Sequence, residues 1–287
     1  MKKVGLVIVN YNDSENTINL VKSVEKYKVI NKIVVVDNKS TDDSLKKLEE
    51  LENRKIHILQ SDLNRGYSFA INLGAKYLEE KLKDCYIIVS NSDIEIKDEE
   101  QIKGLLTSFD EPNVAVVMPK VYENGLVKYG WKLTNANIDL LMSIPLVSRL
   151  YKDSLKNYEP LYFGYSNIVD VIYGCFFVID SVVLKSIGYM DENTFLYYEE
   201  NILAKKLKTV NKLSVINKEA EVTHKHNVSI GSSVSQINKY NIYKKSQLYY
   251  ERHYNNANEI QMFLFEMFYY FGLLGLKVKL FLSELFK

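Results

Sequence analysis

The tripeptide Asn91-Ser92-Asp93 comes directly after the apolar run of residues 86–90. Such a run predicts a buried strand, and alternation along an extended chain would point residues 91 and 93 the same way. A carboxylate and a carboxamide with a common direction can hold one ion, and their oxygen atoms suit a hard cation such as Mg²⁺ or Mn²⁺. All three residue types are also frequent in turns, so a simple strand-to-turn junction is the alternative.

Two more polar clusters follow apolar runs upstream. Asn10, Tyr11 and Asn12 come after residues 4–9, and Asp37 and Asn38 come after residues 33–36. If these runs are parallel strands, their carboxyl ends open onto one edge of the sheet, where α/β proteins bind ligands. We therefore expect one pocket there, in which Asp37 accepts hydrogen bonds from a base or ribose. The sequence has no Gly-x-Gly-x-x-Gly after the first run and no Gly-Lys-[Ser/Thr] loop, which argues against dinucleotide cofactors and P-loop chemistry.

Two adjacent carboxylates, Glu199 and Glu200, follow an aromatic-rich loop that contains Asp191. Paired carboxylates suit general-base catalysis, in which one removes a proton while its neighbour tunes or orients it. If a helix begins here, Glu200 shares a face with Leu203 and Leu207 and points inward. Acidic residues at the start of a helix also complement its macrodipole, which is the structural alternative.

Further candidate ligands lie in two other segments. Asn64, Arg65 and Gly66 precede a predicted helix that contains Asn72, and His224 and His226 lie near the end of a strand-like run. Gly66 permits a close approach or a positive φ. Arg65 could meet a phosphate, although a lone loop arginine is usually solvated. Either histidine could ligate a metal or donate to a phosphate, although most lone histidines do neither.

Apolar periodicity predicts an α/β fold with a parallel sheet and helices on both faces. Strands are expected at 4–9, 33–36, 56–59, 86–90, 114–118, 169–173, 175–179, 212–216 and 219–223, and helices at 14–27, after 40, at 67–82 and 181–187, from 199, and in two segments after 235. Residues 119–165 show no clean period, which is typical of a functional loop region.

Length and composition narrow the class of protein. The 287 residues suffice for one large domain, or one domain with an appendage, and a net charge of +1 gives no electrostatic reason to expect nucleic acid. Cys85 and Cys175 lie in apolar runs, as reduced cysteines of cytosolic proteins do. The apolar run at 4–9 is too short for a signal sequence, so we expect a cytoplasmic protein.

Taken in order, these segments resemble glycosyltransferase family 2, the inverting enzymes with the nucleotide-diphospho-sugar-binding GT-A fold. The resembling motifs are Val7–Asn12, Val35–Asp42, Asn64–Tyr67 with Asn72, Asn91–Asp93 in place of an Asp-x-Asp motif, and Gly188–Glu200. The resemblance runs from residue 3 to about 230. It implies a Rossmann-like GT-A domain with a mostly parallel sheet over residues 1–230, comprising a nucleotide-sugar half (1–118) and an acceptor half (119–230), and a C-terminal helical extension at 235–287.

The resemblance also implies roles for the candidate residues. The nucleotide sugar would contact Asn10, Tyr11, Asn12, Asp37, Asn38, Asn64, Arg65, Gly66, Asn72, Asn91 and Ser92. Asp93 and His224 would be the residues near the metal, Mg²⁺ or Mn²⁺, on the diphosphate. The catalytic base would be Glu200, with Glu199 beside it and Asp191 as the next candidate.

These implications predict an inverting glycosyltransferase of the hexosyl- or rhamnosyltransferase type. It would move a sugar from a nucleoside-diphosphate sugar donor to a glycan or lipid-linked glycan acceptor in the synthesis of a bacterial surface polysaccharide such as capsule. Asn91 and Glu200 each replace an aspartate of the family pattern, which keeps open a degenerate member that binds glycan or nucleotide without catalysis. A nucleotidyltransferase on a similar fold is the other alternative, but it would normally carry a Gly-rich basic loop after the first strand.

The C-terminal segment 258–287 is rich in aromatic residues, leucine and lysine. Glu266 and Lys277 limit its uncharged stretch to ten residues, which is too short to span a membrane. A helix of this composition could lie on a membrane surface, which would place the protein at the inner face of the plasma membrane. Packing against its own domain or a second subunit is the alternative.

Overall fold

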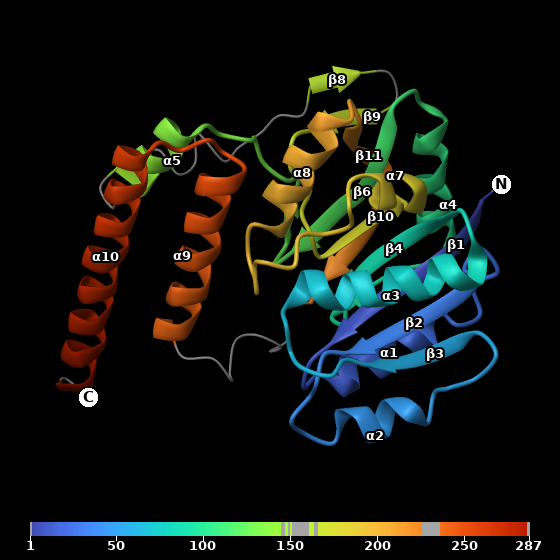
Figure 1. The fold of residues 1–287 in the computed structure, drawn as a ribbon. Helices are drawn as coiled ribbons and strands as arrows, with labels where there is room; N and C mark the ends of the chain where they lie inside the picture. Colours follow the sequence, from blue (N-terminus) through green and yellow to red (C-terminus); the bar gives the residue numbers. More distant parts are fainter. Residues whose placement is uncertain are drawn as a thin grey trace.

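The computed structural model of the protein describes residues 2–144, 147–148, 150, 161–163, 166–225 and 236–285. Its sheet has the strand order β3-β2-β1-β4-β10-β6-β11-β9-β8, with β5 paired to β11 and β7 paired to β6 (Figure 1). The strands are β1 (Lys3–Asn10), β2 (Lys32–Asp37), β3 (Ile56–Gln60), β4 (Cys85–Asn91), β5 (Ile94–Glu95), β6 (Val114–Glu123), β7 (Leu126–Lys128), β8 (Leu161–Phe163), β9 (Ser166–Val169), β10 (Phe176–Asp180) and β11 (Leu213–His224). The helices are α1 (Ser14–Val24), α2 (Ser44–Glu49), α3 (Tyr67–Leu82), α4 (Glu99–Thr107), α5 (Ala136–Met142), α7 (Ser181–Ser186), α8 (Glu199–Thr209), α9 (Gln236–His253) and α10 (Glu259–Leu285).

The alternation of strands and helices predicted for the first hundred residues is confirmed. β1 pairs in parallel with both β2 and β4, and β2 pairs in parallel with β3. Residues 33–36 of β2 have no exposed surface, as expected for a strand covered on both faces. In Figure 1, α3 lies in front of these strands and α1 lies behind them. These parallel strands bring their carboxyl ends to one edge of the sheet.

The rest of the sheet is mixed rather than mostly parallel. β10 runs antiparallel to both β4 and β6, so it separates the N-terminal parallel strands from the parallel pair β6 and β11. The strand predicted at 169–173 is wrong in its bounds, because β9 ends at Val169 and only a bridge between Trp131 and Val171 follows. Both described cysteines are free and buried, as expected.

β6 and β11 are longer than the sequence predicted. β6 continues past residue 118, through Pro119, to Glu123. The two strands expected at 212–216 and 219–223 form the single strand β11, whose pairing with β6 shifts register between Asn217 and Glu221. The extra length matters for function, because it carries the ends of β6 and β11 to the edge where β4 ends.

The C-terminal residues form two helices, α9 and α10, which stand beside the sheet with α5 near one end of the pair (Figure 1). α9 contacts the loop before α8, since Ser246 Oγ donates to Leu196 O at 2.7 Å. The rings of Tyr198 and Tyr250 lie 5.2 Å apart across the same contact. Among the described helices, none combines the length and apolar character needed to cross a membrane.

Candidate active site

The three strand-end clusters lie at one edge of the sheet, as expected from parallel pairing. Asn10 lies opposite Asp37 where β1 pairs with β2, and Val9 lies opposite Asn91 where β1 pairs with β4. The strands that the sequence predicted therefore position the clusters, and the loops between strand and helix decide where each side chain points.

Asp37 is the centre of a buried network at the ends of β1 and β2. Its carboxylate accepts hydrogen bonds from Asn10 Nδ2 (2.9 Å) and from both the hydroxyl and the backbone N–H of Ser40 (3.1 Å for the N–H). The Ser40 hydroxyl also accepts the backbone N–H of Asn12 at 2.9 Å, while Tyr11 is half-buried between these residues. Asn10, Asn12 and Asp37 thus shape the floor of the candidate nucleotide site.

The loop before α3 requires glycine where it meets the loop before α8. Gly66 has a φ of 101°, and a Cβ there would lie 2.2 Å from the carbonyl oxygen of Phe195. Asn38 Nδ2 donates to Asn64 Oδ1 and to Gly66 O, each at 3.0 Å, which ties this loop to the end of β2. The loop before α3 is therefore fixed between the strand-end cluster and the segment that leads to Glu199.

Two residues predicted to contact nucleotide make contacts within the protein. The Asn72 carboxamide exchanges hydrogen bonds with the backbone of Met190, at 2.9 and 3.0 Å, and so anchors the loop before α8. Arg65 pairs with Asp62 at 2.7 Å, and half of the Arg65 side chain is exposed. Their contact with a nucleotide remains a prediction.

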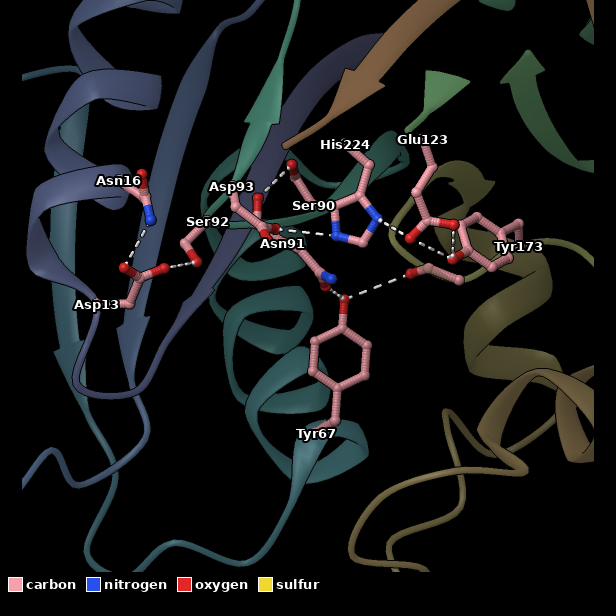
Figure 2. Close-up of polar contacts among 11 residues, drawn as sticks. Asp13, Asn16, Tyr67, Ser90, Asn91, Ser92, Asp93, Glu123, Tyr173 and His224 are labelled. Carbon is pink, nitrogen blue, oxygen red and sulfur yellow. Dashed lines mark hydrogen bonds and ion pairs between the residues drawn. The ribbon is translucent and has the colours of Figure 1, made fainter. Parts of the chain in front are cut away.

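The segment after β4 turns, which corrects the expectation that residues 91 and 93 share one direction. β4 ends at Asn91 and the next two residues form a turn, so strand alternation does not apply to them. Asn91 Oδ1 accepts the hydroxyl of Tyr67 at 2.7 Å, and Ser92 Oγ donates to Asp13 at 2.6 Å. Asn91 therefore uses its carboxamide oxygen on α3, in a direction different from that of Asp93 (Figure 2).

The imidazole of His224 lies between two buried carboxylates (Figure 2). Its Nε2 is 3.2 Å from Asp93 Oδ1 and its Nδ1 is 3.4 Å from Glu123 Oε1, and no side chain of the three is more than 7% exposed. Burial by itself lowers the pKa of His224, but the two carboxylates outweigh it and the pKa is raised. Glu123 was not among the expected site residues, because β6 was expected to end before it. His226 lies outside the described residues.

Asp93 and His224 offer two donors of the kind a divalent cation takes. Asp93 Oδ1 is buried, and His224 Nε2 approaches it to 3.2 Å without the geometry of a strong hydrogen bond. Two ligands held at about 2.1 Å and at right angles lie about 3 Å apart, close to the 3.2 Å between Asp93 Oδ1 and His224 Nε2. Within the described part of the chain, no group of three or more His, Cys, Asp or Glu side chains surrounds one metal position. The two donors therefore fit a cation whose other ligands are diphosphate oxygens and water.

Glu199 and Glu200 begin α8 after two residues, Tyr197 and Tyr198, with left-handed backbone (φ of 72° and 71°). Glu199 is only 5% exposed and Glu200 is half-buried as a residue, but the Glu200 carboxylate lies against Gly174, so both carboxylates are directed into the protein. Burial and the charge of Glu200 raise the pKa of Glu199 to about 8. Burial raises the pKa of Glu200 to about 7, against the opposing effect of backbone N–H groups that include that of Gly174.

Gly174 and Tyr67 connect this carboxylate pair to the strand-end cluster. A Cβ at Gly174 would lie 2.1 Å from Glu200 Oε1, so the carboxylate rests directly against this glycine. The Tyr67 hydroxyl donates to Asn91 Oδ1 and lies 3.4 Å from Gly174 O. Burial raises the pKa of Tyr67 well above its usual value, so its hydroxyl stays a donor. Neither residue was expected in this role from the sequence.

Asp191 is held against the C-terminal helices. Its carboxylate accepts hydrogen bonds from the hydroxyls of Tyr249 and Tyr254 and from the backbone N–H of Asn193. Burial alone would raise the pKa of Asp191, but these hydrogen bonds outweigh it and the pKa is lowered. A carboxylate stabilised in its charged form is a weak base, so the geometry favours Glu199 and Glu200 over Asp191 for proton removal.

Sequence comparison identifies relatives of the chain. Residues 6–187 match the sequence model of the family described as Glycosyl transferase family 2. The low-salt glycan biosynthesis hexosyltransferase Agl10 of Haloferax volcanii is 29% identical over 197 residues, which cover 69% of this chain and 59% of Agl10. The chain thus spans less than two thirds of the length of this curated relative.

Solved structures share the fold. GalNAc-T7 with UDP, GalNAc and Mn²⁺ superposes with a TM-score of 0.61 at 17% identity, covering 86% of this chain and 47% of that one. The mannosyltransferase PcManGT from Pyrobaculum calidifontis, with GDP-Man and Mn²⁺, gives a TM-score of 0.57 at 11% identity, covering 87% of this chain and 64% of that one. These similarities confirm the predicted GT-A fold.

Proposed function

Because the chain belongs to glycosyltransferase family 2, we propose that it moves a hexose from a nucleoside-diphosphate sugar to a hydroxyl of a glycan or lipid-linked glycan. The name of Agl10 as a hexosyltransferase supports the choice of sugar class. The nucleotides bound to GalNAc-T7 and PcManGT support the choice of donor class. We further propose that residues 1–230 are the catalytic domain, with a nucleotide-sugar half and an acceptor half, that 235–287 is an extension, and that the product is a bacterial surface polysaccharide.

One observation carries the proposal: the carboxylate pair and the strand-end cluster lie side by side. Glu200 rests against Gly174, and Tyr67 contacts both Gly174 and Asn91. A donor whose diphosphate lies at Asp93 would therefore present its sugar towards Glu200. If residues 91–93 were only a turn without catalytic function, there would be no reason for the buried pair Glu199 and Glu200 to lie beside them.

In the proposed reaction, Glu200 takes the proton of the acceptor hydroxyl as that oxygen attacks the anomeric carbon. The bond from that carbon to the nucleoside diphosphate breaks on the opposite side, so the anomeric configuration inverts. Mg²⁺ or Mn²⁺, held by Asp93 and His224, would neutralise the charge on the leaving diphosphate. Burial keeps the pKa of Glu200 near neutral, and the charge of Glu200 raises the pKa of the adjacent Glu199 further, so Glu199 ionises after the base.

Nucleotide binding can be tested before the acceptor is known. A panel of UDP-, dTDP- and GDP-sugars with Mn²⁺ should include at least one donor that raises the melting temperature, since a ligand of the native state stabilises it by about 2.7 kcal/mol at 100 times its Kd. Asp37→Ala should weaken binding of that nucleotide by about 1–3 kcal/mol in calorimetry, through loss of a charge-assisted hydrogen bond and of the loop network.

The matched control is Asp43→Ala, which removes an exposed carboxylate paired with Lys47 in the same loop region. It should leave nucleotide affinity unchanged. A panel in which no nucleotide sugar stabilises the protein contradicts the proposed donor class. If wild type and Asp37→Ala bind the nucleotide with equal affinity, the nucleotide does not bind at the ends of β1 and β2.

We also propose that α10 contacts a membrane surface. It exposes eight large apolar side chains that recur at helical spacing, namely Ile260, Phe263, Tyr270, Phe271, Leu274, Val278, Phe281 and Leu282. Exposed lysines at 277 and 279 flank this stripe, as on helices that lie in the headgroup region of anionic membranes. A lipid-linked acceptor would be presented at such a surface.

Replacing Phe271, Leu274 and Phe281 together with serine should reduce co-sedimentation of the full chain with vesicles of phosphatidylcholine and phosphatidylglycerol. Loss of apolar contact causes the reduction, and the melting-temperature shift with donor should persist because these side chains are exposed. The control replaces Leu126, an exposed leucine on β7, with serine. Equal co-sedimentation of wild type and the triple variant would contradict the membrane proposal.

A further inference from the structure

We infer that Glu123, at the end of β6, is a positioning residue that fixes the His224 ring so that Nε2 faces Asp93 and the diphosphate-bound cation. The inference rests on the proposed function. In it, Glu123 contacts the metal ligand His224 but does not itself bind the cation. The supporting observation is the position of the His224 imidazole between Asp93 and Glu123 (Figure 2).

Each ring nitrogen of His224 lies near a different carboxylate. Nε2 lies 3.2 Å from Asp93 Oδ1, and Nδ1 lies 3.4 Å from Glu123 Oε1 on the opposite side of the ring. A neutral imidazole that directs its Nδ1–H to a carboxylate leaves the lone pair of Nε2 for a metal, and ligating histidines in proteins commonly have such a partner. Glu123 is thus placed to select the tautomer that can bind a cation next to Asp93.

Other side chains hold the Glu123 carboxylate in place. The Tyr173 hydroxyl donates to both of its oxygens, at 3.0 and 3.1 Å, and Lys128 Nζ lies 3.6 Å from Oε2. Glu123 itself is 6% exposed. A buried carboxylate costs free energy unless charged or polar partners compensate, so the cluster is built to keep this charge beside the histidine.

The direct test is calorimetry of UDP, dTDP and GDP binding in the presence of Mn²⁺ or Mg²⁺, using full-length Glu123→Leu and Glu123→Gln. Loss of a carboxylate partner to a ligating histidine lowers metal affinity by roughly 10–100-fold, so Glu123→Leu should weaken Mn²⁺-dependent binding by about that factor. Glu123→Gln should restore part of it, because the amide oxygen can still accept the Nδ1–H. Mg²⁺-dependent binding should fall less, because Mg²⁺ depends less on nitrogen ligands.

Glu95→Gln is the matched control, since it removes the same charge from β5 beside His224 but from an exposed ion pair with Lys225. It should bind as wild type does. The inference is overturned if Glu123→Leu keeps wild-type Mn²⁺-dependent affinity, or if Mn²⁺, Mg²⁺ and metal-free binding all fall equally, as in a purely structural role. If the leucine variant does not fold, the ratio of Mn²⁺ to Mg²⁺ affinity in Glu123→Gln decides, and an unchanged ratio overturns the inference. Wild type that binds none of UDP, dTDP and GDP with metal would overturn the proposed function as well.

Discussion

Glu200→Gln should retain donor binding and lose turnover by about 10²–10⁴-fold, the usual cost of removing a general base. Glutamine has nearly the same shape but cannot take the acceptor proton. The position is sensitive because the Glu200 carboxylate rests against Gly174, where no larger residue fits. The measurement is kcat with a saturating donor, together with the donor's melting-temperature shift as a test of binding.

Glu199→Gln is the matched control, since it changes the adjacent buried carboxyl. Its loss of turnover should be smaller. Because the two carboxyls titrate as a pair, kcat should rise with pH through apparent values near 7 and 8, and Glu199→Gln should leave a single rise near 7, since burial alone raises the pKa of Glu200. If Glu199→Gln is inactive and Glu200→Gln is active, Glu199 is the base. If both variants are active, the base is another residue.

The same pair predicts a pH dependence of stability. Each carboxyl has a pKa in the folded protein above its ordinary 4.5, so the native state keeps protons that the unfolded chain has released. The contribution of the pair to stability is therefore complete below pH 4.5 and is lost as pH rises towards 8. Glu199→Gln should flatten that decline in urea unfolding measured from pH 5 to pH 8.

Asp93→Ala should abolish transfer while leaving the fold intact. The substitution removes one of the two donors proposed for the cation, and the remaining His224 cannot hold a divalent ion on a diphosphate by itself. The fold should remain because Asp93 lies in the turn after β4, while loss of its 3.2 Å pairing with His224 should lower the melting temperature. Activity and melting temperature of the variant are the measurements.

Asn91→Ala is the comparison for Asp93→Ala, because it lies two residues away at the same strand end. Its effect should be smaller, since its carboxamide oxygen is already occupied by the Tyr67 hydroxyl. Excess chelator should inactivate the wild type to the level of Asp93→Ala. Full activity in chelator, or an active Asp93→Ala, contradicts a cation at this position.

Much of the fold was predictable because its signals are local. The N-terminal strands are continuous apolar runs such as residues 33–36, and burial on both faces leaves no other arrangement for them. Polar clusters immediately after those runs had to reach one sheet edge once the strands were parallel. The order of these motifs also predicted the family, which the match over residues 6–187 confirms.

The missing part of the site depends on long-range pairing, which periodicity does not reveal. β6 was expected to end at Met118, yet it continues to Glu123 through Pro119, a residue that cannot donate a hydrogen bond to a neighbouring strand. Proline fits there because it pairs with Asn217 of β11, the residue after which the pairing of β6 with β11 shifts register. Glu123 and His224 therefore meet through two strand ends separated by about a hundred residues of sequence.

Side-chain direction was the other limit. Alternation predicted a shared direction for Asn91 and Asp93, but the strand ends at Asn91 and a turn follows. Tyr67 then draws Asn91 towards α3, a contact that depends on how the helix crosses β4. Helix-face reasoning directed Glu200 inward, where its carboxylate lies against Gly174, but it did not reveal that Glu199, after the left-handed residues Tyr197 and Tyr198, is buried too.

The most direct test of the account is to identify, by mass spectrometry, the products formed from the donor that binds, in the presence of Mn²⁺ and a glycan acceptor panel. We expect free nucleoside diphosphate together with acceptor enlarged by one sugar, and neither product from Glu200→Gln at comparable times. Release of nucleoside monophosphate with sugar phosphate would instead indicate cleavage within the diphosphate. That result, or an intact donor under all conditions, would contradict glycosyl transfer by this chain.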